Sequence, residues 1–246
     1  MSHRKALILL SFVIACCSLP TCYASGESIP SVDFELSAVS KYVWRGLVFN
    51  EDLVIQPSLT ASWESGVSFN LWGNFDTTDF CGTKNRCNEL DYTLGYEWES
   101  GGKGLGIAYA AYTYPSTSFA GTSEVSASCD FGGEFGANIC LNWDVVEAKG
   151  LYVNLGWAKT ACLGGMSVDL SGGFGVASRR HSEYYYGAPI SGLTDATVCL
   201  EVPIEAHGGW SVIPSITYAS VLKRSLRQAV EHPDNYVFGV TVAKTL

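Results

Sequence analysis

The sequence predicts an all-β fold: a transmembrane, antiparallel, up-and-down β-barrel of about twelve strands that follows an export signal. Three observations predict it. Apolar and polar residues alternate with a period of two, the alternating runs are about as long as membrane-crossing strands, and short turns alternate with long loops. Only 16% of the 246 residues are charged and 13% are aromatic, which excludes a disordered chain.

The first residues have the composition of a secretory signal peptide. Residues 1–24 combine a short basic start at Arg4 and Lys5, an apolar stretch and a small residue at Ala24. We therefore expect export, cleavage after Ala24 and one barrel domain over residues 25–246. Two alternatives stay open: an uncleaved membrane anchor, and a lipoprotein signal in which Cys16 carries the lipid.

The charge of the chain argues against nucleic acid as a partner. Residues 1–24 contain two basic residues and no acid, so their removal leaves 13 basic against 24 acidic residues. Proteins that bind nucleic acid carry a basic stripe or patch, because they must neutralise phosphates.

The period-two alternation is clearest in six runs and recurs more weakly in six others. In the run 89–98, the even-numbered positions are apolar and the odd-numbered positions include Glu89, Asp91 and Glu97. Such a run forms a strand with one apolar and one polar face. The twelve predicted strands cover residues 32–44, 53–63, 67–76, 89–98, 105–114, 123–131, 137–144, 150–159, 166–177, 193–203, 210–220 and 235–246.

Two architectures fit strands of this kind. A soluble sandwich turns its apolar faces inward, whereas a membrane barrel turns them outward to lipid. The barrel is favoured because the runs approach the ~9–11 residues that cross a bilayer, and because long loops follow mostly the odd-numbered strands. Aromatic residues also stand at strand ends, as in the interfacial girdles of barrels. They are Trp44, Trp63, Phe75, Trp98, Trp143, Trp157, Trp210, Tyr218 and Tyr236.

The barrel prediction implies a location in the bacterial outer membrane. Lipid offers no hydrogen-bond partners, so only a sheet without edges satisfies every backbone group. An even number of strands places both termini on the periplasmic side. The last strand alternates and ends in apolar Leu246, which is similar to the signal read by the barrel assembly machinery. We expect outer-membrane lipid and this machinery as partners.

Short motifs carry a family resemblance. Residues 40–46 read Ser-Lys-Tyr-Val-Trp-Arg-Gly, residues 56–59 read Gln-Pro-Ser-Leu, and residues 71–76 read Leu-Trp-Gly-Asn-Phe-Asp. Tyr-Thr-Tyr-Pro follows at 112–115, before Glu124. The chain resembles the TorF-type porins, a family of bacterial outer-membrane proteins. This resemblance implies an outer-membrane barrel with a porin role, and it brings no catalytic residues. The six cysteines after residue 24 depart from the cysteine-poor composition usual for such barrels.

Charged residues on the polar faces are candidates for the lining of a pore. By the assigned parity they point inward, and carboxylates in a narrow pore favour cations. The candidates are Lys41, Arg45, Glu89, Asp91, Asp169, Asp195 and Glu201. We expect passive diffusion of small solutes or ions through a narrow, acid-lined lumen, with Arg45 in a structural or constriction role. The alternatives are a rim salt bridge of Arg45 with Asp52 or Asp76, and inward charges that pair and plug the barrel as a structural or adhesion protein.

The loops suggest further, weaker hypotheses. Cys81 and Cys87 bracket five residues of one long loop, which permits a local disulfide. Basic residues in other loops would attract lipopolysaccharide or an adhesion partner. They are Arg179, Arg180, Lys223, Arg224 and Arg227.

A hydrolase at the barrel rim, around His181, Ser182 and Glu183, is a third functional hypothesis. Adjacent loop residues do not make a triad by themselves, so we expect no enzyme. We also expect no cofactor and no metal site, since no cysteine or histidine spacing typical of metal ligands is present.

Overall fold

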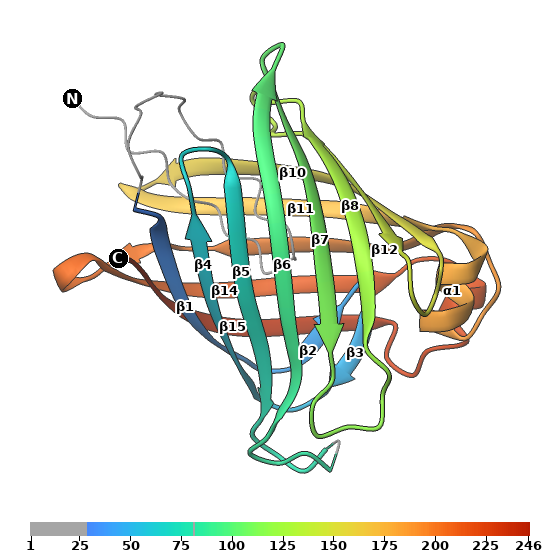
Figure 1. The fold of residues 1–246 in the computed structure, drawn as a ribbon. Helices are drawn as coiled ribbons and strands as arrows, with labels where there is room; N and C mark the ends of the chain where they lie inside the picture. The colour runs from blue at the N-terminus through green and yellow to red at the C-terminus, as the bar shows by residue number, and fades with distance from the viewer. Residues whose placement is uncertain (1–28, 81) are drawn as a thin grey trace.

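The computed structural model describes residues 29–80 and 82–246, and the predicted export signal lies outside them. Within this part of the chain, twelve strands form one closed antiparallel barrel (Figure 1). Its strands are β1 (Ser31–Val39), β4 (Val54–Ser62), β5 (Val67–Asp76), β6 (Cys87–Ser100), β7 (Lys103–Thr113), β8 (Thr122–Asp130), β9 (Asn138–Asp144), β10 (Leu151–Leu163), β11 (Met166–Ala177), β12 (Gly192–Glu201), β14 (Trp210–Val221) and β15 (Asp234–Thr245).

Each barrel strand pairs with its neighbours in sequence, and the ring closes between the first and last strands. β1 pairs with β4 on one side and with β15 on the other, and β12 pairs with both β11 and β14. No edge is left in this ring, so the backbone of the wall is paired throughout, as a bilayer requires. The predicted up-and-down barrel of about twelve strands is confirmed, and the sandwich alternative is wrong.

The two ends of the barrel differ. Short turns connect β4 to β5, β6 to β7, β8 to β9, β10 to β11 and β12 to β14, and both described termini lie at this end, here called the turn end. The turn after β12 carries the small strand β13 (Ile204–Glu205) and a 3-10 helix (His207–Gly209). Most of the longer connections lie at the opposite end, here called the loop end. Two of them contain helices, α1 (Arg179–Tyr186) and α2 (Arg224–Arg227).

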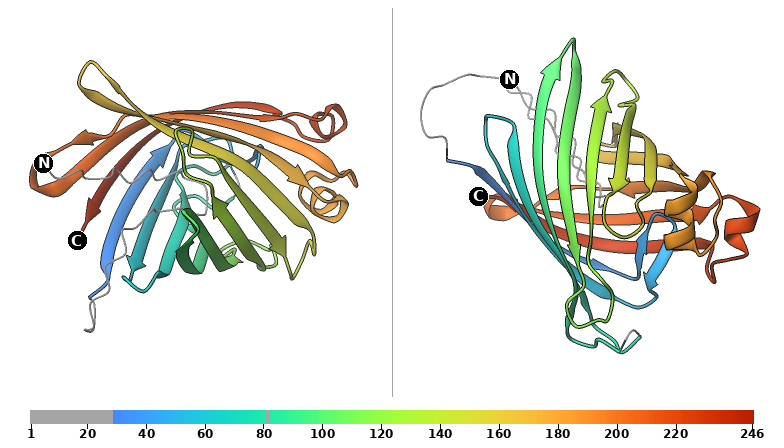
Figure 2. Two further views of the ribbon diagram at one scale, coloured as in Figure 1. Left: turned by 90° about the horizontal axis from the view of Figure 1, so that it is seen from above. Right: turned by 45° about the vertical axis from the view of Figure 1, so that its right-hand side comes forward.

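One predicted strand boundary is wrong. The predicted first strand extends to residue 44, but β1 ends at Val39 and the chain then turns into a hairpin of β2 (Tyr42–Trp44) and β3 (Leu47–Asn50). The alternation of residues 42–44 is real, but it belongs to this hairpin and not to the wall. Figures 1 and 2 show the hairpin beside α1, toward the loop end.

The side chains follow the predicted faces. Most fully buried side chains are polar or charged, whereas large apolar side chains such as Leu94, Phe174 and Val240 are about half exposed on the outer surface. A soluble protein buries its apolar residues instead, so this inverted distribution suits a barrel surrounded by lipid. Among the described residues, no helix is both long and apolar enough to cross a membrane.

The aromatic residues at strand ends fall into three groups. Phe75, Trp98, Trp143, Trp210, Tyr218 and Tyr236 are exposed on the outside, as interfacial residues would be. Trp157 is partly buried. Trp63 is half-buried at the turn end and borders the cavity there. Trp44 instead lines the interior, so its assignment to an outer girdle is wrong. Trp44 is turned inward because it lies on the hairpin.

Candidate functional site

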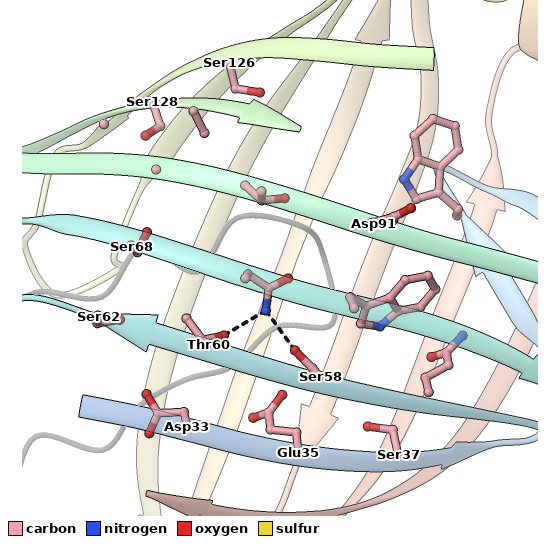
Figure 3. A pocket seen from close by; sticks show the side chains of 18 of the residues that line it. Asp33, Glu35, Ser37, Ser58, Thr60, Ser62, Ser68, Asp91, Ser126 and Ser128 are labelled. Carbon is pink, nitrogen blue, oxygen red and sulfur yellow. Dashed lines mark hydrogen bonds between the residues drawn. The ribbon is translucent and has the colours of Figure 1, made fainter. Parts of the chain in front are cut away.

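The barrel encloses a cavity of about 370 Å³ that extends from the turn end to the hairpin. More than half of the residues that line it carry hydroxyl, amide or carboxyl side chains on the inner faces of the strands. Figure 3 shows part of this wall, where Asn70 donates hydrogen bonds to Ser58 and Thr60 at 2.9 and 2.8 Å. A wall of this kind is wettable and offers many hydrogen-bonding groups along its length.

Six of the side chains that line the cavity are acidic. They are Asp33, Glu35, Glu89, Asp91, Glu97 and Glu201. Within the described residues, the lining contains a single basic side chain, Lys41, whose Nζ donates to the amide oxygen of Asn235 at 3.3 Å. No ion pair involves any of the six acids in this part of the chain. Among the described residues, no basic side chain is therefore paired with these acids.

The β2–β3 hairpin closes the cavity on the side of the loop end. Its two-residue turn is Arg45–Gly46, with φ of 49° and 79°, and Trp44 pairs directly with Leu47. Positive φ at both central residues is the geometry that lets a hairpin reverse without splaying its strands. A Cβ on Gly46 would lie 3.0 Å from the Cβ of Asp195, so only glycine fits here without rearrangement.

Arg45 at the tip of the hairpin is held from the far side of the barrel. Its two terminal nitrogens contact the two carboxylate oxygens of Glu124 at 2.7 and 2.8 Å, and its guanidinium carbon lies 4.1 and 4.0 Å from the ring centroids of Trp44 and Tyr152. Glu124 lies on β8, five strands from β1 around the ring. The ion pair therefore spans the interior, and both partners are buried. A bidentate pair of this kind is short and strongly oriented.

Helix α1 supports the same contact. The Ser178 side chain caps its N-terminus, and Gly187 in the left-handed conformation ends it. The helix places the Nε2 atom of His181 at 2.9 Å from the guanidinium of Arg45, while the Tyr186 hydroxyl donates to the Arg45 carbonyl at 2.6 Å. We call the hairpin, α1 and the side chains that contact them, including Asp195 on β12, the plug.

The ionisation state of His181 follows from its surroundings. Because a guanidinium only donates, Nε2 must accept and the ring proton must lie on Nδ1. Burial, together with the positive charge of Arg45, lowers the pKa of His181 from its ordinary 6.5 to about 2. The imidazole is therefore neutral in the folded protein at physiological pH.

We expect this buried neutral imidazole to make the folded protein less stable as the pH falls from 7 to 5. The unfolded chain takes up a proton on His181 near pH 6.5 and the folded chain does not, so the unfolded state gains protons. The free energy of unfolding should drop by up to about 2 kcal/mol more in the wild type than in His181→Asn. Urea unfolding in lipid vesicles at both pH values measures this difference, and parallel losses in the two proteins would contradict it.

Asp195, also in the plug, accepts hydrogen bonds from neighbouring hydroxyls. The donors are the side chains of Thr194 at 2.7 Å, Tyr186 at 3.1 Å and Tyr152, whose closer contact is 3.1 Å. These bonds tie β10, α1 and β12 together beside the tip of the hairpin. Asp195 therefore joins these elements through hydrogen bonds, and it does not line the cavity.

The structure separates the seven pore-lining candidates into two groups. Lys41, Glu89, Asp91 and Glu201 line the cavity. Three others do not, since Arg45 and Asp195 lie in the plug, and Asp169 is buried on β11 and accepts a hydrogen bond from Thr160 at 2.6 Å. A role for any of them in permeation stays a prediction.

The remaining predictions about individual side chains have mixed outcomes. Glu124 is the partner of Arg45, so the proposed rim pair with Asp52 or Asp76 is wrong; Asp76 accepts instead from Asn50 at 2.7 Å.

Cys81 lies outside the described residues, and the Cys87 sulfur donates to the carbonyl of Glu89 at 3.2 Å. The Cys81–Cys87 pairing stays a prediction.

The region around His181 does not have the arrangement of a hydrolase. In the described chain, no hydrogen bond links the side chains of His181, Ser182 and Glu183, and the Ser182 hydroxyl has no partner. His181 instead faces Arg45. A nucleophile must lie within hydrogen-bonding reach of its base, which this geometry does not provide.

Three solved structures that are similar to this chain are outer-membrane channels. The KdgM porin aligns with a TM-score of 0.53 over 88% of this chain and 99% of its own, at 8% identity. The same porin in complex with disordered oligogalacturonate aligns with a TM-score of 0.52 over the same shares, at 8% identity. An outer-membrane channel from Pseudomonas putida F1 aligns with a TM-score of 0.50 over 90% of this chain and 97% of its own, at 8% identity. At this identity the likeness shows the fold alone.

The amino-acid sequence matches the model of one protein family. No protein with a curated description matches the chain. Residues 24–152, more than half of the chain, match the model of the family Gcw_chp, which is described as a bacterial protein of unknown function. The chain, a twelve-stranded barrel with a plugged loop end and an acidic cavity, belongs to this family.

Proposed function

We propose that this protein is an outer-membrane channel that lets small solutes or ions, preferentially cations, diffuse passively through an acid-lined lumen. The observation that carries the proposal is the cavity, whose six carboxyl side chains have no ion-pair partner and are accompanied by one lysine. Unneutralised carboxylates along a narrow path lower the energy of a passing cation and raise that of an anion. No chemical step is involved.

The outer surface supports a place in the outer membrane. Half-exposed apolar side chains cover the wall, the closed ring leaves no strand edge, and the first and last described residues lie at the turn end. In the outer membrane this end would face the periplasm and the plug would face outside. The partners would be outer-membrane lipid, lipopolysaccharide near the basic loops, and the barrel assembly machinery. The family model that matches is Gcw_chp, so the narrower resemblance to TorF-type porins stays a prediction.

The acidic cavity argues for a different solute from that of one structural neighbour. That neighbour, the KdgM porin, was solved with oligogalacturonate. A chain of galacturonate units carries many carboxylates, and the cavity of the present protein would repel it. The shared fold therefore does not carry the same solute, because selectivity depends on the side chains that line the lumen.

Planar-bilayer recording with the refolded protein tests the proposal. We expect discrete ohmic steps in potassium chloride, and a reversal potential in a salt gradient that shows potassium to be more permeant than chloride. Glu89→Gln should reduce this preference, whereas Glu147→Gln, which removes an exposed carboxylate at the loop end, should leave it unchanged. A membrane that stays silent, or an anion preference, would contradict the channel.

A second candidate function is a plugged structural or adhesion barrel. The plug favours it, because Arg45 and Glu124 join the hairpin to the opposite wall and block the straight path to the loop end. A silent membrane in the recording described above would support this candidate. No observation in the structure favours the rim hydrolase.

A further inference from the structure

We propose that the cavity contains a binding site for a primary ammonium group, formed around Asp91 where the cavity meets the plug. The inference rests on the proposed channel function and deepens it, since it assigns the solute class as organic amines. It depends on the geometry of β5, β6, β7 and the hairpin.

Asp91 is the centre of this site. Its side chain lines the cavity and is only 3% exposed, and its Oδ1 atom has no hydrogen-bond partner (Figure 3). An ionised carboxylate can only accept hydrogen bonds, so this oxygen lacks a donor. Buried polar atoms are nearly always satisfied, and a ligand is one of the explanations for an exception.

Aromatic rings flank Asp91 on both neighbouring strands. Trp72 on β5 and Tyr112 on β7 are its direct cross-strand neighbours, and both line the cavity. Tyr42 of the hairpin lies with its ring centroid 5.7 Å from that of Trp72. Aromatic faces attract an organic cation, and the attraction grows when the site is shielded from water. A carboxylate set among aromatic rings is therefore complementary to an ammonium group on a carbon chain.

The site has more acidic than basic side chains. Glu89, two residues before Asp91 on the same face of β6, is also buried and lines the cavity. The basic groups of the cavity lining and of the hairpin tip have other partners, because Lys41 donates to Asn235 and Arg45 pairs with Glu124. Buried charges are normally paired. A bound cation would supply the missing pair.

Other ligands fit less well. In the described chain, no group of three or more acidic, histidine or cysteine side chains is arranged to hold a metal ion. A quaternary ammonium ion has no N–H, so it could not satisfy the Oδ1 atom of Asp91. A primary ammonium group has three N–H donors. Small organic amines with an alkyl chain meet both the hydrogen-bonding and the aromatic requirement.

Calorimetric titration of the full-length protein in detergent with butylammonium chloride, at constant ionic strength, tests the site. We expect saturable binding, an affinity lower by about tenfold or more in Asp91→Asn, and a comparable loss in Glu89→Gln. Tetramethylammonium should bind several-fold more weakly than butylammonium. The matched control Asp79→Asn, which alters an exposed carboxylate at the loop end, should bind as the wild type does. Resistance of the folded barrel to denaturation in electrophoresis identifies any variant that does not fold.

The outcomes separate this inference from the channel proposal. Absence of butylammonium binding, equal affinity for tetramethylammonium, or unchanged affinity in both folded carboxylate variants would overturn the site even if the protein conducts. Saturable binding that depends on Asp91, in a protein that does not conduct, would support the site and overturn the channel.

Discussion

Leu94→Arg is expected to destabilise the folded barrel in a bilayer by about 2–4 kcal/mol, and Thr93→Arg, one position away, is expected to cost clearly less. Leu94 lies near the middle of β6 and is 56% exposed on the outer surface. Its cross-strand neighbours are Phe69 and Tyr109, which are exposed on the same face. An arginine there would place its charge in the hydrocarbon layer.

Thr93 is the matched control because it has the same depth and the opposite face. It lines the cavity, where its cross-strand neighbours are Asn70 and Ala110 and where Asp91 and Glu97 share its face of β6. An arginine at this position would meet water and carboxylates. Urea unfolding of both variants in vesicles of the same phospholipid measures the two losses. Equal losses would show that the two faces of β6 are not exposed to lipid and water respectively, and would contradict the placement of the barrel in a membrane.

Most of the wall could be predicted from the sequence because the two faces of each strand meet different surroundings. Along β6, hydrocarbon on one side and the cavity on the other impose the alternation of residues 89–98, and the observed strand contains that whole run. The same reasoning placed Glu89 and Asp91 inside. Where the surroundings are uniform, as in the loops, periodicity gives no such constraint.

The plug could not be predicted, because its contacts are distant in sequence and its local pattern is ambiguous. Residues 42–44 alternate as a wall strand does, and only the Arg45–Gly46 turn shows that the chain reverses there. Glu124 is 79 residues from Arg45, and its inward position alone does not name its partner. The capping residues Ser178 and Gly187 were the available signal for α1, which was predicted as a loop.

The second large effect is expected at the ion pair that fixes the plug. Arg45→Met should lower the free energy of unfolding by about 3–5 kcal/mol, because it leaves the Glu124 carboxylate buried without its cation. Both side chains are nearly inaccessible, at 6% and 1% exposure, so water cannot replace the lost contact. Lys41→Met is the matched control. Lys41 also carries a cation near the hairpin, but its one hydrogen bond is long and only partly buried, so its loss should cost less than about 1 kcal/mol.

The double variant Arg45→Met, Glu124→Gln shows whether the stability lost in Arg45→Met comes from an unpaired buried charge or from lost packing. With both charges removed, most of the stability should return, since a neutral pair carries no charge to desolvate. Single-channel conductance gives the functional result. If the ion pair holds the hairpin across the lumen, Arg45→Met should raise the conductance above that of the wild type, while Glu147→Gln, which alters an exposed carboxylate at the loop end, should not. Unchanged stability and conductance in Arg45→Met would mean that other contacts of the hairpin, such as the bond from Tyr186 to the Arg45 carbonyl, suffice to keep the plug in place.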